Sequence, residues 1–362
     1  MKRLAARRMF AVVAAATAAT TSSAIGPVTA LASGRDDGGE HAFLSVMTRN
    51  MDEGTDFGYI TAAAGQPQLL GPAIVKTFCE VVASNVEQRA MRIADEIAAN
   101  RPDIVSLQEV AEWQSFVPLP CSAPTTIDAE RALLARLAAR DAGYHVVTQL
   151  DEFNSASIPG LPVSFLDRDV LLARDRDEDR LSIANVMAQH FGTVLAIPLA
   201  PGVNVTILRG WMSADVTVDE RTVRIIGTHL ESFFEPVQQA QALELVSGPG
   251  KTSLPVIVAG DLNTGPGSKQ TKSYTFLTQT AGFTDTWTAT RPHDAGFTDS
   301  FYTEDPLTPA VPSERIDLVL VRGIDVPSAP KDFLVGTEIP HPSDHAGVVA
   351  RLTLHSDDGE ED

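Results

Sequence analysis

Side chains able to bind metal ions or transfer protons recur at the ends of apolar runs in this 362-residue sequence. Asn50 follows "VMTR", Glu109 follows "IVSLQ" and His229 follows "RIIGT". The apolar run "VIVA" leads into "GDLN", which contains Asp261 and Asn263. A single strand-end Asp is typically a turn or cap residue, and a single His is typically structural. The recurrence of amide, carboxylate and imidazole groups after successive apolar runs is hard to explain by turn chemistry and indicates a shared site.

Two further segments place charge inside or against apolar sequence near the C-terminus. Asp317 lies within "RIDLVLV", and Asp344 and His345 directly precede "AGVVARLTL". A buried charge without a partner is costly, so Asp317 requires a nearby donor or cation. We therefore predict that distant segments converge on one pocket, lined by Glu109, Asp261, Asp317, Asp344 and His345.

The elements that position these residues are read from the spacing of apolar residues. Helical spacing predicts helices at 85–100 and 128–143, the first with Asn85 and Gln88 in capping-box spacing. Runs rich in Val, Ile and Leu predict strands at 43–51, 103–110, 169–173, 211–218, 222–230, 254–262, 315–321 and 346–354. Strands with a few helices along the chain predict two packed sheets with helices outside them.

Two connections have features of their own. Asp219 and Glu220 separate two apolar runs and predict a tight antiparallel hairpin. The segment 58–82 is too long for a simple connection, and long loops in compact domains are usually functional or mobile.

The order of these motifs resembles that of the endonuclease/exonuclease/phosphatase superfamily, over roughly residues 43–355. The resemblance is carried by "TRNM", "LQEV", "THLES", "GDLN", "RIDLVL" and "SDHAGVV". It implies a four-layered α/β sandwich, in which two packed mixed β-sheets are flanked by helices. It also implies a metal-dependent phosphoesterase. The simplest case is a phosphodiesterase that hydrolyses P–O bonds by in-line attack of an activated water.

The resemblance implies a role for each motif residue. Glu109 would be the principal metal ligand, with Asn50 and Asp344 lining the same site, and oxygen ligands of this kind suit Mg²⁺ or Mn²⁺. His345 would be the catalytic imidazole and Asp317 its buried partner. Asp261 would orient or deprotonate the attacking water. The donors to the phosphate oxygens would be Asn263 and His229.

One segment departs from the family pattern. Many relatives carry a Gly-rich segment of the form "GVAILS", where this chain reads "LDRDVLLARD". Arg168 could bind phosphate through its planar fork, and Asp169 could contact the active-site histidine or a metal-bound water. The alternative is a surface salt bridge at the start of a strand.

The N-terminus has the features of an export signal. Four basic residues in "MKRLAARRMF" precede an Ala/Val/Thr run and "ALA", which predicts a signal peptide over 1–32. A buried N-terminal helix is the alternative, and "RRMF" also allows twin-arginine rather than Sec export. A short flexible segment at 33–42, the catalytic domain at 43–355 and an acidic tail at 356–362 would follow. In a secreted chain, Cys79 and Cys121 most simply form a disulfide, with free thiols as the alternative.

The charge of the chain limits its partners. The formal net charge is -19, and a chain this acidic lacks the basic stripe of a stable nucleic-acid binder. Transient substrates remain open: nucleic acid, a phospholipid headgroup, or a small phosphomonoester such as an inositol phosphate. A non-catalytic binding protein is a further alternative. We expect a monomer. Apolar residues could make peripheral membrane contact or simply cover the core: Tyr59, Ile60, Leu69, Leu70, Phe78, Phe233 and Phe234.

Overall fold

The computed structural model describes residues 41–122, 124–156, 158–175, 180–200, 203–303, 307–326 and 332–355. The predicted signal peptide at 1–32 and the acidic tail at 356–362 lie outside the described residues. The predicted flexible segment 33–42 is wrong at its last two positions. His41 and Ala42 belong to a strand and pair with His355 and Leu354, because Ala42 is fully buried in the core.

The first sheet has eight strands. It is mixed, because β1 and β2 are parallel whereas β1 and β16 are antiparallel. The strands pair in the order β15 (Phe333–Val335), β16 (Gly347–His355), β1 (His41–Asn50), β2 (Ile104–Gln108), β6 (Val163–Arg174), β3 (Glu112–Ser115) and β4 (Thr126–Asp128). Off this path, β5 (Tyr144–Asn154) pairs with β6.

The second sheet has six strands and is also mixed, with β11 and β12 parallel. Its strands pair in the order β13 (Thr284–Asp285), β14 (Asp317–Arg322), β12 (Val256–Asp261), β11 (Arg221–His229), β10 (Gly210–Val218) and β7 (Leu181–His190). A separate two-stranded sheet is formed by β8 (Leu195–Ala200) and β9 (Val203–Ile207).

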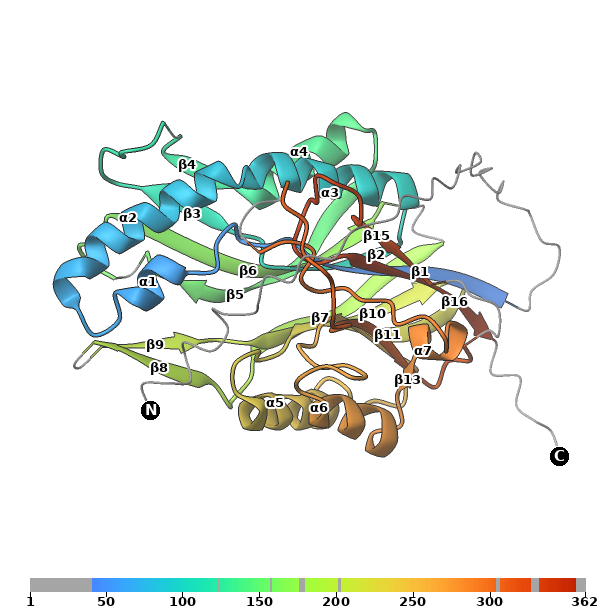
Figure 1. Cartoon of the computed structure of the whole chain (residues 1–362). Coiled ribbons are helices and arrows are strands. Elements are labelled where there is room, and N and C mark those ends of the chain that lie inside the picture. Colours follow the sequence, from blue (N-terminus) through green and yellow to red (C-terminus); the bar gives the residue numbers. More distant parts are fainter. Residues whose placement is uncertain are drawn as a thin grey trace, which may run out of the picture. The chain divides into compact units, whose positions relative to one another are not determined.

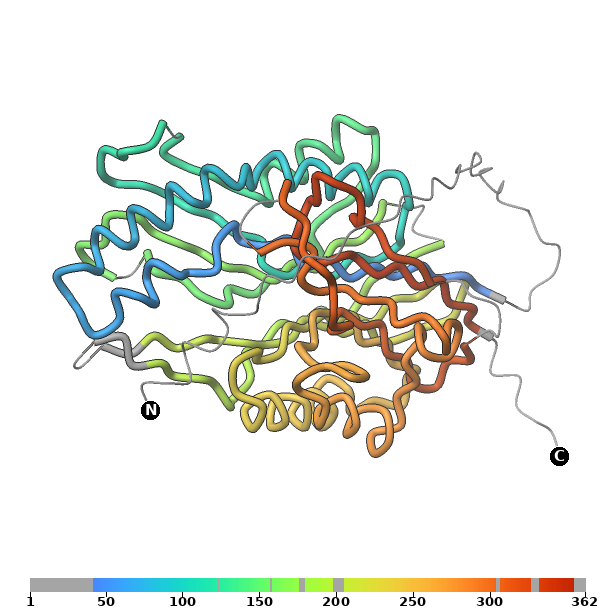
Figure 2. Tube along the Cα trace, viewed as in Figure 1, coloured from blue at the N-terminus to red at the C-terminus, as the bar shows by residue number. Residues whose placement is uncertain are grey.

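Helices cover the outer faces of the two sheets, α2 to α4 on the first and α5 and α6 on the second (Figures 1 and 2). The helices are α1 (Gly58–Ala62), α2 (Pro67–Ala83), α3 (Val86–Asn100), α4 (Ala129–Ala139), α5 (Glu235–Ser247), α6 (Lys272–Thr275), the π-helix η1 (Phe276–Thr280) and α7 (Thr286–Thr290).

Three apolar cores separate the layers. On β1, Leu44 and Val46 face the core between the sheets, whereas Met47 faces the core beneath α2 to α4. This is the two-residue alternation of a strand buried on both faces. The third core lies between the second sheet and α5, where Leu245 packs with Leu320. The predicted four-layered α/β sandwich is therefore confirmed.

Most predicted elements are present with shifts of a few residues. The predicted hairpin joins β10 to β11, and both turn residues have positive φ, 45° for Asp219 and 69° for Glu220. A two-residue turn of this kind matches the right-handed twist of its strands. At α4, the Asp128 side chain accepts a hydrogen bond from the Arg131 N–H at 3.0 Å and caps the helix. The predicted capping box of α3 is wrong, because Asn85 has φ 55° and makes no side-chain cap bond.

The segment 58–82, expected to be a long loop, is mostly helical. Pro67 stands in the first turn of α2, where its missing N–H is tolerated. Ile74 and Phe78 then pack into the core beneath the helices, and Phe78 is fully buried. Phe78 is therefore a core residue, and the membrane contact suggested for it is wrong. Among the described helices none alone is long and apolar enough to span a membrane, although α2 and α3, bent by 42°, meet that test together.

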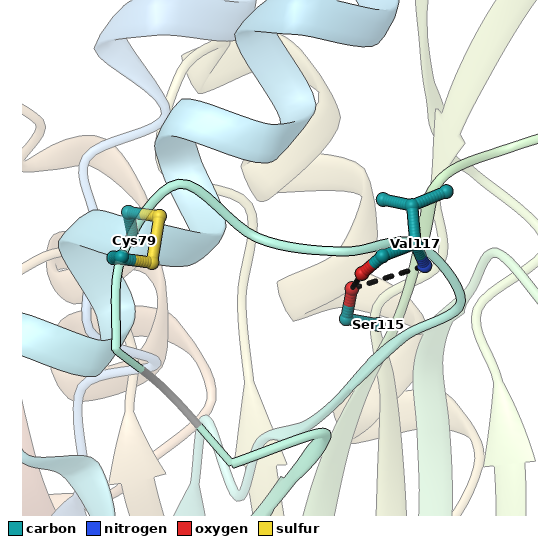
Figure 3. Close-up of a disulfide and its surroundings, with 4 residues drawn as sticks. Cys79, Ser115 and Val117 are labelled. Carbon is teal, nitrogen blue, oxygen red and sulfur yellow. Dashed lines mark hydrogen bonds between the residues drawn. A yellow bond between two sulfur atoms is a disulfide. The ribbon is translucent and has the colours of Figure 1, made fainter.

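A disulfide joins Cys79 of α2 to Cys121 in the connection after β3, as predicted (Figure 3). Ser115 begins the same connection and donates from Oγ to the Val117 carbonyl at 3.0 Å. The bridge closes a chain segment with a sequence separation of 42 residues. Closing a loop of this length stabilises the folded state by about 4 kcal/mol in the chain-entropy description.

Alkylation tests this bridge directly. Unfolded protein treated with iodoacetamide without reductant should gain no mass, and prior reduction should add two labels, because both thiols are tied in the bridge. Intact-mass spectrometry reads the result. Two labels on the unreduced protein would disprove the disulfide.

Candidate active site

The strand order brings the predicted polar residues to one edge of each sheet. In the second sheet, His229 at the end of β11 pairs in register with Asp261, which pairs with Asp317 at the start of β14. In the first sheet, Asn50 ends β1 and Glu109 directly follows the parallel strand β2. The Asn50 Nδ2 donates to Asp261 Oδ2 at 3.2 Å and so connects the two sheets.

His345 and Asp317 form a hydrogen-bonded pair, as expected. His345 Nδ1 lies 2.8 Å from Asp317 Oδ2, and Asp317 is fully buried. The backbone of His345 is held by Ser343, whose Oγ accepts its N–H, and by Arg49, which donates to its carbonyl. Burial disfavours the charged imidazole, but Asp317 and then Asp344 outweigh burial and raise the pKa of His345 well above its ordinary value.

Asp261 lies at the centre of the group. Its Oδ2 is 3.5 Å from His229 Nε2 and 3.9 Å from His345 Nδ1. Its Oδ1 accepts the Asn263 N–H at 2.9 Å. Burial, followed by the neighbouring charge of Asp317, raises the pKa of Asp261 to about 7. This carboxylate is therefore placed between the two histidines, where it can orient or accept a proton.

The two predicted phosphate donors differ in their surroundings. His229 is buried, and its Nδ1 lies 2.7 Å from Arg209 Nη1. Burial and the Arg209 charge lower the pKa of His229 well below its ordinary value. Asn263 is half-buried with φ 49°, and its Nδ2 donates to the Leu230 carbonyl at 3.0 Å. One N–H of the Asn263 amide is thus used within the protein, and among the described residues no partner is seen for the other, which can donate to a ligand.

Glu109 lies beside two acidic residues, Asp52 and Glu53, that come shortly after Asn50 in sequence. Asn50 Nδ2 donates to Glu109 Oε1 at 2.9 Å, and the Glu53 N–H donates to Glu109 Oε2 at 3.4 Å. Ligand oxygens of Asp52, Glu53 and Glu109 all lie within 4.8 Å of one another. Burial opposes the charged form of Glu109, but hydrogen bonding from the Glu53 side chain and then the imidazole of His229 hold its pKa at about 2.

This cluster fits a divalent cation. Glu53 Oε2 is buried and has no hydrogen-bond partner in the part of the chain that the structure describes. Burial and then the charge of Glu109 raise the pKa of Glu53 well above its ordinary value, because the two carboxylates lie close together in a buried environment. The donor set is all oxygen, which suits Mg²⁺ or Mn²⁺ rather than a softer metal.

Asp344, the third predicted metal ligand, has different immediate neighbours. Ligand atoms of Asp344, Asp299 and His345 all lie within 4.8 Å of one another. Burial and then the charge of Asp52 raise the pKa of Asp344 well above its ordinary value, and Glu109 contributes to the same shift. Asp344 therefore interacts electrostatically with Glu109 and Asp52, but its close neighbours are Asp299 and His345.

Arg168 does not point a free guanidinium toward a phosphate. It is buried, and it lies 2.9 Å from Glu130, 3.5 Å from Asp128 and 3.9 Å from Glu112. The geometry favours a salt bridge for this residue, because three carboxylates surround its guanidinium, but Arg168 is buried inside β6 rather than on the surface at a strand start. Asp169 is buried, with Oδ1 3.9 Å from His229 Nδ1, which places it near a histidine of the site but beyond hydrogen-bond distance.

Several residues of the site were not predicted from the sequence. Asp52 and Glu53 had a signal, because "NMDEG" places two further acids directly after the strand that ends at Asn50. Tyr302 donates to Asp52, and Arg89 pairs with it at 3.4 Å. Arg209 lies in the connection before β10 and had no signal, because its partner is 20 residues away in sequence.

Comparison with known proteins supports the fold and the family. A sequence model of the Endonuclease/Exonuclease/phosphatase family matches residues 82–345. No curated protein matches the sequence. An endonuclease/exonuclease/phosphatase from Beutenbergia cavernae DSM 12333 has a similar structure, with 23% identity, a TM-score of 0.50, and coverage of 87% of this chain and 72% of that chain.

Two further solved structures are similar. TDP2 of D. rerio, complexed with single strand DNA product, has 18% identity and a TM-score of 0.51, covering 86% of this chain and 99% of that chain. A family protein from Leptotrichia buccalis C-1013-b has 13% identity and a TM-score of 0.54, covering 84% and 98%. Identities this low show the fold alone, but the family match extends over more than half of the sequence. This chain therefore belongs to the endonuclease/exonuclease/phosphatase family, whose members are generally hydrolytic phosphoesterases.

Proposed function

We propose that this chain is an exported phosphodiesterase that depends on Mg²⁺ or Mn²⁺. The observation that carries the proposal is the meeting of three kinds of group around Asp261. The His345–Asp317 pair, the His229 imidazole and the Asn50–Glu109 contact all lie beside this carboxylate. Hydrolysis of a phosphodiester needs an oriented water, donors for the phosphate oxygens and a cation, and these residues can supply or hold all three.

The protein's own residues divide the reaction between them. Asp261 orients the attacking water and accepts its proton. Asp317 occupies Nδ1 of His345, which leaves the Nε2 of that ring, 3.5 Å from Asp299 Oδ1, to donate to a phosphate or leaving-group oxygen. His229 and Asn263 donate to the other phosphate oxygens as charge develops.

Glu109 is the proposed principal ligand of the cation, with Asn50 and Asp344 as further ligands; we include Asp52 and Glu53 because their oxygens lie within 4.8 Å of those of Glu109. Such a cation supplies positive charge that neutralises the anionic phosphate. The Asn50 oxygen already accepts the Asp52 N–H at 2.9 Å, so its side chain is held beside the cluster.

Export and substrate class are supported by features away from the site. The basic and apolar N-terminal sequence and the Cys79–Cys121 bridge both suit an oxidising compartment. Phe233 and Phe234 follow His229 closely in sequence and are 64% and 51% exposed. Exposed aromatic residues of this kind suit a phospholipid substrate as well as the bases of a nucleic acid.

A chelation assay tests the proposal. The purified chain should hydrolyse bis-p-nitrophenyl phosphate, EDTA should abolish the activity, and Mg²⁺ or Mn²⁺ should restore it, because the carboxylate cluster requires a cation to bind the anion. Release of nitrophenolate is followed by absorbance. Activity that resists EDTA would contradict the metal requirement, and exclusive hydrolysis of p-nitrophenyl phosphate would indicate a phosphomonoesterase. Parallel assays with DNA, RNA, sphingomyelin and phosphatidylcholine would then identify the substrate class.

A further inference from the structure

Arg209 directly contacts the ring of His229 and is held rigidly there. Its side chain is buried, and its Nη1 lies 2.7 Å from His229 Nδ1. The backbone around it is fixed, since its carbonyl accepts the Phe191 N–H at 2.9 Å and the next residue, Gly210, pairs with His229 across β10 and β11. The contact therefore follows from the register of the sheet rather than from a flexible surface side chain.

The chemistry of this contact determines the position of a proton. Arginine has only donor N–H groups, so His229 Nδ1 must accept with its lone pair. The single proton of the neutral ring is then on Nε2, the atom that lies 3.5 Å from Asp261 Oδ2. Asp169 could have imposed the opposite arrangement by accepting a proton from Nδ1, but its Oδ1 is 3.9 Å from that atom.

The two histidines of the site are thus held in opposite ways at the same ring atom. His345 Nδ1 lies 2.8 Å from a carboxylate, Asp317, which requires a proton on Nδ1. His229 Nδ1 lies against a guanidinium, which requires that Nδ1 carry none. A neutral His229 bearing its proton on Nε2 can donate to a substrate oxygen from that atom but cannot accept a proton there.

Acidic residues around Arg209 help to hold its guanidinium beside His229. Glu152, Asp167, Asp169 and Glu231 all interact electrostatically with its charge. Yet within the described residues the one side-chain hydrogen bond of Arg209 is to His229, and both carboxylate oxygens of Glu152 are buried without a partner. The carboxylates keep the guanidinium in place as a group, and its directed contact is with the imidazole.

We propose that Arg209 is a positioning residue that fixes His229 as a dedicated Nε2–H donor to the substrate phosphate. The role in turnover rests on the proposed phosphodiesterase function, whereas the tautomer does not. Two independent measurements therefore test it, one on the protein without substrate and one on its kinetics.

The first measurement is nitrogen NMR of the wild-type protein labelled with ¹⁵N-histidine, with the His229 signals assigned by their loss in His229→Gln. We expect a neutral ring with the proton on Nε2 at pH 7. A ring protonated on Nδ1, or on both nitrogens, would overturn the proposal. This measurement does not depend on activity. If the protein hydrolyses no phosphodiester, the proposed function is refuted, but the NMR spectrum still shows which nitrogen of His229 carries the proton.

The second measurement compares Arg209→Met with Arg209→Lys and with a matched control, Arg224→Met. Arg224 lies on the same strand as His229, is largely buried and pairs with Asp215. Arg209→Met should lower kcat by about 10- to 100-fold with little change in KM, because the donor acts on charge that develops in the transition state. Arg209→Lys keeps a cationic donor and should recover part of this loss.

Arg224→Met should lower the melting temperature and leave kcat within about twofold of the wild type, since it removes a buried ion pair remote from the chemistry. Circular dichroism confirms that each variant is folded before its kinetics are measured. Equal losses of kcat in the Arg209→Met and Arg224→Met variants, or a kcat for Arg209→Met within twofold of wild type, would overturn the proposal. If Arg209→Met does not fold, the wild-type NMR result decides the tautomer by itself.

Discussion

Replacing His345 with alanine should lower kcat for a phosphodiester by about 100- to 10,000-fold, the range for loss of a positioned acid–base group. The Nδ1 of this imidazole lies 2.8 Å from the buried carboxylate of Asp317, and its Nε2 lies 3.5 Å from Asp299 Oδ1. Removing the ring takes away both the substrate contact and the partner of Asp317. Steady-state kinetics with bis-p-nitrophenyl phosphate measure the loss.

The same substitution should also cost stability. Asp317 is fully buried, and a buried carboxylate left without its partner costs about 1 to 3 kcal/mol, which thermal melting would detect. His190→Ala is the matched control, because it removes an imidazole that lies 2.7 Å from the Asp151 carbonyl outside the site. Full activity of His345→Ala, or an equal loss in His190→Ala, would reject the assignment of His345.

Replacing Glu109 with glutamine should abolish most metal binding and lower kcat by about 100- to 1000-fold. The amide keeps the shape of the side chain but removes the negative charge from the cluster formed with Asp52 and Glu53. A divalent cation binds through the sum of such charges, so the loss of one carboxylate weakens binding directly. Titration calorimetry with Mn²⁺ measures affinity independently of turnover.

Glu244→Gln provides the control for this experiment. Glu244 lies on α5 and accepts the backbone N–H groups of Gly192 and Thr193 at 2.7 and 3.0 Å. Its neutralisation should reduce stability without changing Mn²⁺ affinity. Unchanged Mn²⁺ affinity in Glu109→Gln would show that the cation binds elsewhere and would remove the basis of the proposed mechanism.

The central strands of the two large sheets were predictable because their signal is local. On β1, alternate apolar residues enter different cores, so the apolar run that includes Leu44, Val46 and Met47 can be recognised without knowing its neighbours. Of the strands in these two sheets, β3, β4, β5, β7, β13 and β15 were not predicted. The segment 58–82 was misread because its helical face, including Phe78, becomes apparent only when the core that it covers is known.

The site was predictable to the extent that its residues follow strands in sequence. His229, Asp261 and Asp317 end or begin neighbouring strands, so the ladder that pairs them also brings their side chains together. Arg168 was ambiguous because its partners, Glu130 among them, belong to another strand and helix. Arg209 was missed because nothing near it in sequence indicates that its guanidinium meets an imidazole.

The sequence by itself determined the layered α/β architecture, the family resemblance and the identity of the groups able to do chemistry, since apolar periodicity and strand-end side chains are written in consecutive residues. The tertiary structure alone decided which polar groups face one another. It placed Asp52 and Glu53 beside Glu109, tied Arg168 to structural carboxylates and set Arg209 against His229. Partnership between charges depends on distances of a few ångströms between residues far apart in the chain, and those distances exist only after the sheets have paired.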